Sequence, residues 1–264
     1  MLMARGLESA SAKIFRAMKL RKPLQDSITE YGNTQPYTKS IKPSGKVVLQ
    51  ITKAPPIEIS VMAGEIIYQL RSALDHMFFD LVERYWNGSI PEKTANRLYF
   101  PLCLRPPGEP TKQPPIPRSS FGEAVIPGCL PDEAFEIIES LQPYYRLHHG
   151  HQLLKMLHIF GKIDRHRHLN ATAVAVNRSH TVTVQPSGFS STVMMPWLKD
   201  GAELYEPWHD ININASMEIT DEYEIVLGFD EPEYGPVQIA PMTDVYALPT
   251  FIFNISIHLK KFLV

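Results

Sequence analysis

Cysteine is scarce in this 264-residue sequence, which contains Cys103 and Cys129 but no CxxC pair. Two isolated cysteines argue against a disulfide framework and fit a reducing compartment. The sequence also has no large excess of positive or negative charge, because 26 lysines and arginines oppose 28 aspartates and glutamates. The net charge of -2 excludes a global basic field of the kind that attracts nucleic acid, so any anion-binding surface must be a local patch.

Long hydrophobic runs are absent as well. The most apolar stretch, 251–262, is interrupted by Asn254, Ser256 and His258, and it is too short to span a bilayer. Near the N-terminus, basic residues between positions 13 and 21 break up any signal-like apolar segment. We therefore expect a cytoplasmic protein that does not have a membrane partner.

The motifs of nucleotide binding and serine-hydrolase chemistry are missing too: the sequence has no glycine-rich phosphate loop, no GxGxxG and no GxSxG. What is present is an ordinary globular composition, 44% hydrophobic and 20% charged. The 23 prolines cluster most densely between Pro101 and Pro131, where they predict a long loop.

Apolar residues recur at three- and four-residue spacing over 58–86, which predicts a long helix with one continuous apolar face. The apolar positions of this helix are Ile59, Met62, Ile66, Leu70, Ala73, Leu74, Met77, Leu81 and Tyr85. Further helices are predicted at 7–20, 132–141 and 152–168. A helical tail is predicted at 242–264, in which Pro249 either kinks the helix or restricts it to the residues that follow.

β-branched and alternating patterns predict a strand at 45–53 and several strands within 171–240. Those later strands are predicted at 171–176, 181–185, 202–208 and 216–229, and the turn residues between them favour antiparallel pairing. We therefore predict a single α+β domain over 1–264. Its helical bundle takes about 1–170 and 241–264, the antiparallel sheet at 171–240 is appended to the bundle, and the C-terminal helix packs back.

The long helix carries a group of residues that is suited to chemistry on a phosphodiester. Arg71 and Asp75 lie four residues apart and can form an ion pair on one face. His76 is five residues from Arg71, about 140° around the helix, and four residues from Asp80, which can orient the ring and raise its pKa. A guanidinium suits a phosphate and an imidazole moves protons, so Arg71 and His76 are a minimal set for metal-independent cleavage.

The spacing Arg71-x4-His76, late in a long helix of a bundle, resembles the HEPN superfamily of small helical domains. The resemblance implies an endoribonuclease without a metal or other cofactor, with a composite site across a homodimer. Arg71 would bind the scissile phosphate, His76 would act as acid or base, and attack by the RNA 2′-hydroxyl would leave a cyclic phosphate. It also implies a setting in phage defence or a toxin–antitoxin system, with an antitoxin or defence protein as partner.

A wider pattern is similar to a group of uncharacterised bacterial and phage proteins. It consists of Leu70–His76, Phe100-Pro101, Ser140–Tyr144 and Ile163–Arg167. The resemblance to this group does not imply a particular activity.

A second cluster lies near the end of the predicted helix 152–168, and six of the ten histidines fall between positions 148 and 168. Arg165, His166 and Arg167 form a dense positive patch that suits RNA phosphates. Asp164 is on the apolar side of this helix, so we expect it to be buried and paired with Arg71 or His76; the alternative is that Asp164 and Arg167 anchor the helix end to the sheet. The histidine spacing is not that of a zinc motif, so no metal is expected.

Two functions remain open on the sequence. The leading prediction is a HEPN-like, metal-independent endoribonuclease with Arg71 and His76 as catalytic residues and Asp75, Asp80 and Asp164 in support. The alternative is a non-catalytic binding or interaction protein in which Arg71, His76 and Asp164 form a structural polar clamp. The exposure and the partners of Arg71 and His76 distinguish the two.

Overall fold

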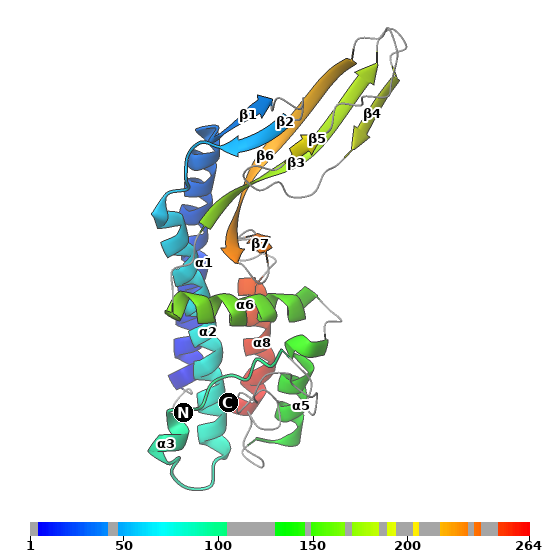
Figure 1. The fold of residues 1–264 in the computed structure, drawn as a ribbon. Coiled ribbons are helices and arrows are strands. Elements are labelled where there is room, and N and C mark those ends of the chain that lie inside the picture. The colour runs from blue at the N-terminus through cyan, green and yellow to red at the C-terminus, as the bar shows by residue number, and fades with distance from the viewer. Residues whose placement is uncertain are drawn as a thin grey trace, which may run out of the picture. The chain divides into compact units, whose positions relative to one another are not determined.

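A computed structural model describes residues 5–41, 47–104, 130–145, 149–166, 171–184, 189–193, 203–205, 217–231, 235–238 and 248–264. The fold is α+β with antiparallel sheets and a C-terminal helix (Figure 1). The chain divides into a helical unit (1–23, 61–169 and 241–264) and a sheet unit (24–60 and 170–240). The predicted sheet part therefore also takes in 24–60. Among the described residues, no helix is both long and apolar enough to cross a membrane.

Helix α2 (Ile57–Tyr85) confirms the predicted helix at 58–86 to within one residue at each end. Most of its predicted apolar stripe lies in the core, and Ile66, Leu70 and Leu74 are completely buried, but Tyr85 at its end is exposed. The helix ends before Gly88, whose φ of 91° is one that glycine adopts without a steric penalty.

Helix α1 (Arg5–Asn33) is longer than the predicted helix at 7–20, because it continues through Pro23. Proline removes one backbone N–H and disfavours a helix interior. Here Leu24 and Tyr31 continue the buried face of Leu20 beyond the proline, and this burial outweighs the local cost of Pro23.

The other helices are α3 (Glu92–Ala95), α5 (Asp132–Ser140), the 3-10 turn η1 (Pro143–Tyr145), α6 (His149–His166) and α8 (Leu248–Leu263). Pro249 lies in the first turn of α8, where its missing N–H leaves no helical bond unmade; positions 242–247 of the predicted tail lie outside the described residues. Helix α8 packs back onto the helical unit, since Arg84 on α2 donates to the carbonyl oxygen of Leu263 at 3.0 Å.

The sheet unit contains a three-stranded sheet in the order β1-β2-β5 and a four-stranded sheet in the order β4-β3-β6-β7, all antiparallel (Figure 1). The strands are β1 (Tyr37–Ile41), β2 (Val47–Ile51), β3 (Ala171–Val184), β4 (Phe189–Val193), β5 (Glu203–Tyr205), β6 (Met217–Glu231) and β7 (Gly235–Gln238).

The strand predictions are wrong in detail, because β1, β4 and β7 have no predicted counterpart and two predicted strands are one. Strand β1 lies in a polar stretch whose own residues do not show a strand pattern. It forms a strand because its backbone pairs with the apolar strand β2. The two strands predicted at 171–176 and 181–185 are one strand, β3, with a register shift between Asn177 and Ser179. The single long partner β6 keeps both halves in one ladder across this bulge.

Candidate functional site

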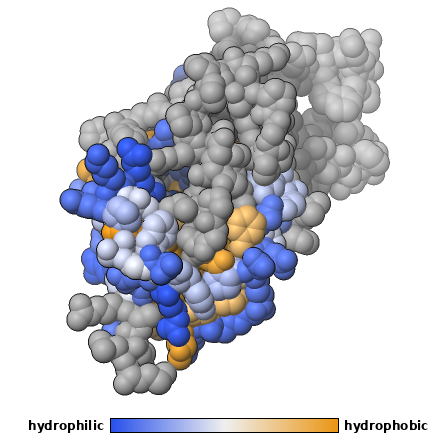
Figure 2. All heavy atoms as spheres, turned by 90° about the horizontal axis from the view of Figure 1, so that it is seen from below, coloured by the Kyte–Doolittle hydropathy of each residue, from blue (hydrophilic) through white to orange (hydrophobic). Residues whose placement is uncertain are grey.

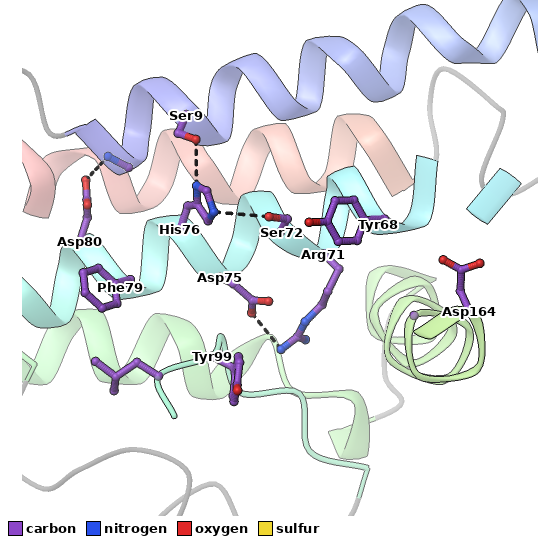
Figure 3. A pocket seen from close by; sticks show the side chains of 13 residues that line it. Ser9, Tyr68, Arg71, Ser72, Asp75, His76, Phe79, Asp80, Tyr99 and Asp164 are labelled. Atoms are coloured by element: carbon purple, nitrogen blue, oxygen red, sulfur yellow. Dashed lines mark hydrogen bonds and ion pairs between the residues drawn. The ribbon is translucent and has the colours of Figure 1, made fainter. Parts of the chain in front are cut away.

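A cavity of about 580 Å³ opens in the helical unit, with walls from α1, α2, α6 and the segment that follows α3 (Figure 3). Its lining residues are Gly6, Ser9, Tyr68, Arg71, Ser72, Asp75, His76, Phe79, Asp80, Leu98, Tyr99, Gly161 and Asp164. Five predicted site residues, Arg71, Asp75, His76, Asp80 and Asp164, therefore meet at one cavity. The side chains of Arg165 and His166 and the whole of Arg167 lie outside the described part of the structure.

Arg71 and Asp75 form the ion pair that their spacing predicts, with Nη2 and Oδ1 2.9 Å apart. The pair also holds the backbone of Phe100. Arg71 Nη2 donates to the Phe100 carbonyl oxygen at 2.7 Å, and the Phe100 N–H donates to Asp75 Oδ1 at 2.9 Å. The side chains of Arg71 and Asp75 are only 14% and 21% exposed. This clamp fixes the Phe100 ring in the core, edge-on to Phe78 with 6.1 Å between the ring centroids.

His76 is held between two serines. Its Nδ1 lies 2.8 Å from Ser9 Oγ on α1, and its Nε2 lies 3.4 Å from Ser72 Oγ one turn earlier on α2 (Figure 3). Burial, together with the positive charge of Lys13, lowers the pKa of His76, which leaves the imidazole neutral at neutral pH.

Asp80 has part of its predicted role: its charge acts to raise the pKa of the His76 ring, but its hydrogen bond goes to Gly6 and does not orient the ring. Asp75 and Asp80 do favour the charged imidazolium, but burial outweighs them. Asp80 Oδ2 instead accepts a 2.6 Å hydrogen bond from the backbone N–H of Gly6, in the first turn of α1. The positive end of a helix dipole is a favourable place for a carboxylate, so Asp80 caps α1 from a neighbouring helix.

Asp164 packs directly against α2 at Gly64. A Cβ at position 64 would lie 2.5 Å from Asp164 Oδ1, so only glycine admits the carboxylate here. Burial raises the pKa of Asp164. The expected partnership is not found: in the described part of the chain, no hydrogen bond or ion pair joins Asp164 to Arg71 or His76. The Arg71 guanidinium is directed along its own helix to Asp75, away from α6 (Figure 3).

Ser9 and Tyr68 also shape this site, although the sequence did not identify them. Ser9 belongs to another helix, and no pattern in the sequence connects it with His76. Tyr68 had a signal, because positions 68, 72 and 76 follow one another at four-residue spacing and share a helix face. Its side chain is 52% exposed at the cavity, and Lys13 Nζ lies 5.6 Å from the centroid of its ring.

The two histidines of this cluster whose side chains are described, His151 and His158, do not line the cavity. His151 is buried, and its Nε2 lies 2.9 Å from the Ser140 carbonyl oxygen, which ties α6 to the end of α5. His148 and His168 lie outside the described residues, and of His149 only the backbone is described. Among the residues described, no group of three or more histidine, cysteine, aspartate or glutamate side chains could hold a metal ion.

Comparisons with family models, with curated proteins and with solved structures find no match to the chain.

Proposed function

We propose that the chain is a non-catalytic binding protein and that the cavity beside α2 is its ligand site. The observation that carries the proposal is the position of Arg71, whose Nη2 already serves Asp75 and the backbone of Phe100. A guanidinium that recognises a phosphate directs its N–H groups at the ligand. Arg71 instead stabilises the segment after α3, which is a structural role.

The charge of the cavity supports the same proposal. Its described lining contains one cationic side chain, Arg71, and three carboxylates, those of Asp75, Asp80 and Asp164. Even with Lys13 nearby, the carboxylates outnumber the cations, so a polyanion would meet repulsion here. The volume of about 580 Å³ is within the range of small-molecule sites, roughly 300–1,000 Å³.

Fragment binding tests the proposal. Small aromatic fragments should shift the amide resonances of Ser72 and Gly161, which line the cavity from α2 and α6. Ser72→Trp fills the cavity and should abolish the shift at Gly161, the reporter that remains in this variant, whereas Ser140→Trp, at an exposed position on α5, should leave the shifts at both residues unchanged. Fragment shifts that persist in Ser72→Trp would place the binding elsewhere and reject the proposal.

The second candidate is the HEPN-like, metal-independent endoribonuclease. The observation in its favour is that Arg71 and His76 line the same cavity, with a neutral imidazole that can accept a proton. In this candidate the chain acts in the cytoplasm as a homodimer, Arg165, His166 and Arg167 contact RNA, and the setting is phage defence or a toxin–antitoxin pair.

Total RNA incubated with the pure protein in EDTA decides between the two candidates. The binding proposal predicts intact RNA. Cleavage that leaves cyclic phosphate ends, and that is lost in His76→Ala, would establish the ribonuclease and overturn the binding proposal.

A further inference from the structure

Asp164 differs from the other two carboxylates of the cavity in having no counter-charge among the described residues. Asp75 is paired with Arg71, and Asp80 is paired with the N-terminal turn of α1 through Gly6. Within the described residues, no hydrogen bond or ion pair reaches the Asp164 carboxylate, although it is half-buried and packed against Gly64.

An unpaired, partly buried carboxylate is unfavourable, because burial removes water that stabilises its charge. The raised pKa of Asp164 has this cause. A cation that entered the cavity and paired with the carboxylate would replace the lost hydration. An anion would add repulsion.

Tyr68 provides a second feature that suits a cation. Its ring is half exposed at the cavity, and the ammonium group of Lys13 already lies 5.6 Å from the ring centroid. Aromatic faces attract ammonium groups through the ring quadrupole, and the same ring covers the apolar part of a bound molecule. Phe79 and Leu98 add apolar surface to the lining.

We infer that the cavity binds a small organic amine, whose ammonium group pairs with Asp164 and whose apolar body lies against Tyr68. This inference rests on the proposed binding function and names its ligand class. The ammonium group of Lys13 lies over the ring of Tyr68, so it competes with the ligand for this ring and repels its charge. The carboxylate of Asp164 therefore attracts the ammonium group of the ligand, and the ammonium group of Lys13 repels it.

Three probes that share one aromatic ring and carry a cationic, a neutral and an anionic substituent test the inference: benzylamine, benzyl alcohol and benzoate. Their dissociation constants are measured on the full chain by following the amide resonances of Ser72 and Gly161. Benzylamine should bind most tightly and benzoate least tightly. Asp164→Asn keeps the shape of the side chain and should weaken benzylamine binding roughly fivefold, about 1 kcal/mol at 1.4 kcal/mol per tenfold.

Two further variants sharpen the test. Lys13→Gln removes the competing cation and should tighten benzylamine binding by roughly two- to threefold. Glu83→Gln, at an exposed position on α2 away from the cavity lining, makes the same change of net charge as Asp164→Asn and should have no effect.

The outcomes separate the inference from the function on which it rests. Benzoate binding as tightly as benzylamine, or equal benzylamine affinity in wild type and Asp164→Asn, would overturn the amine ligand. If benzyl alcohol then still bound at Ser72 and Gly161, the cavity would remain a ligand site. If none of the three probes shifted these resonances, both the ligand class and the binding function would be rejected.

Discussion

Asp80 and Gly6 are 74 positions apart in the sequence, and the carboxylate of one accepts the backbone N–H of the other at 2.6 Å. The contact requires that residue 6 have no side chain, because a Cβ there would lie 2.3 Å from Asp80 Cγ. It joins the first turn of α1 to α2 at the edge of the cavity, close to the hydrogen bond between Ser9 and His76. The N-terminal turn of α1 is therefore part of the cavity wall.

Gly6→Ala should destabilise the fold, because the methyl group displaces Asp80 and breaks the cap. We expect the free energy of unfolding to fall by about 1–2 kcal/mol, the usual cost of a lost helix cap. Gly32→Ala is the matched control in the same helix, since a Cβ at position 32 meets nothing within 4 Å. Alanine there should stabilise the fold by up to about 1 kcal/mol. Urea unfolding measures both, and equal effects would contradict the capping role of Asp80.

The long helix α2 could be predicted from the sequence, because an apolar stripe such as Ile66, Leu70 and Leu74 is encoded at a fixed spacing along one segment. The ion pair of Arg71 with Asp75 could be predicted for the same reason, since both partners lie on one helix.

Contacts between segments could not be predicted in this way. The position of Asp164 depends on the close approach of α6 to α2 at Gly64, and the partner of Asp80 is a backbone N–H of α1. The end of α1 was missed because burial of Leu24 and Tyr31, a tertiary effect, outweighs the local preference of Pro23. The spacing of apolar residues shows which face of a helix is buried. It does not show which polar groups of two helices meet, because that depends on how the helices pack.

Arg71→Met should be strongly destabilising, because it leaves Asp75 a half-buried charge without its cation and removes one of the two bonds to Phe100. We expect a loss of about 2–3 kcal/mol, and a double-mutant cycle with Asp75→Asn should give a coupling energy above about 1 kcal/mol. The control is the pair Arg16–Glu65, whose side chains are 55% and 35% exposed. The corresponding cycle there should give less than about 0.5 kcal/mol.

The strength of that coupling also bears on function. An Arg71→Met protein that kept its full unfolding free energy would show that the clamp is unimportant, and would return Arg71 to the list of candidate catalytic residues. A large loss of stability with intact cavity binding in the surviving folded protein would agree with the structural role.

His76 should make stability depend on pH below about 6.5, its ordinary pKa. Burial lowers the pKa of the folded-state imidazole, so in this range the unfolded chain binds a proton that the folded chain resists. The free energy of unfolding should therefore fall as the pH drops from 7 to 5. His76→Gln should flatten this slope, and His258→Gln, at an exposed position on α8, should leave it unchanged. A slope that persists in His76→Gln would assign the titration to another group.

Asp164 should change the pH dependence of the unfolding free energy in the direction opposite to that of His76. Burial raises its pKa above the ordinary value of 3.8, so at neutral pH the folded chain holds a carboxylate whose charge is disfavoured. As the pH falls through the raised pKa, the folded state takes up a proton before the unfolded state does, and this group's contribution to stability increases. Asp164→Asn should therefore be more stable than wild type at pH 7, and the difference should shrink as the pH falls toward 4. Glu83→Gln should give no such trend.

Benzylamine should reduce the difference in unfolding free energy between Asp164→Asn and wild type at pH 7, because it supplies the counter-charge only to wild type. A difference that stayed constant at saturating benzylamine would contradict pairing of the amine with Asp164.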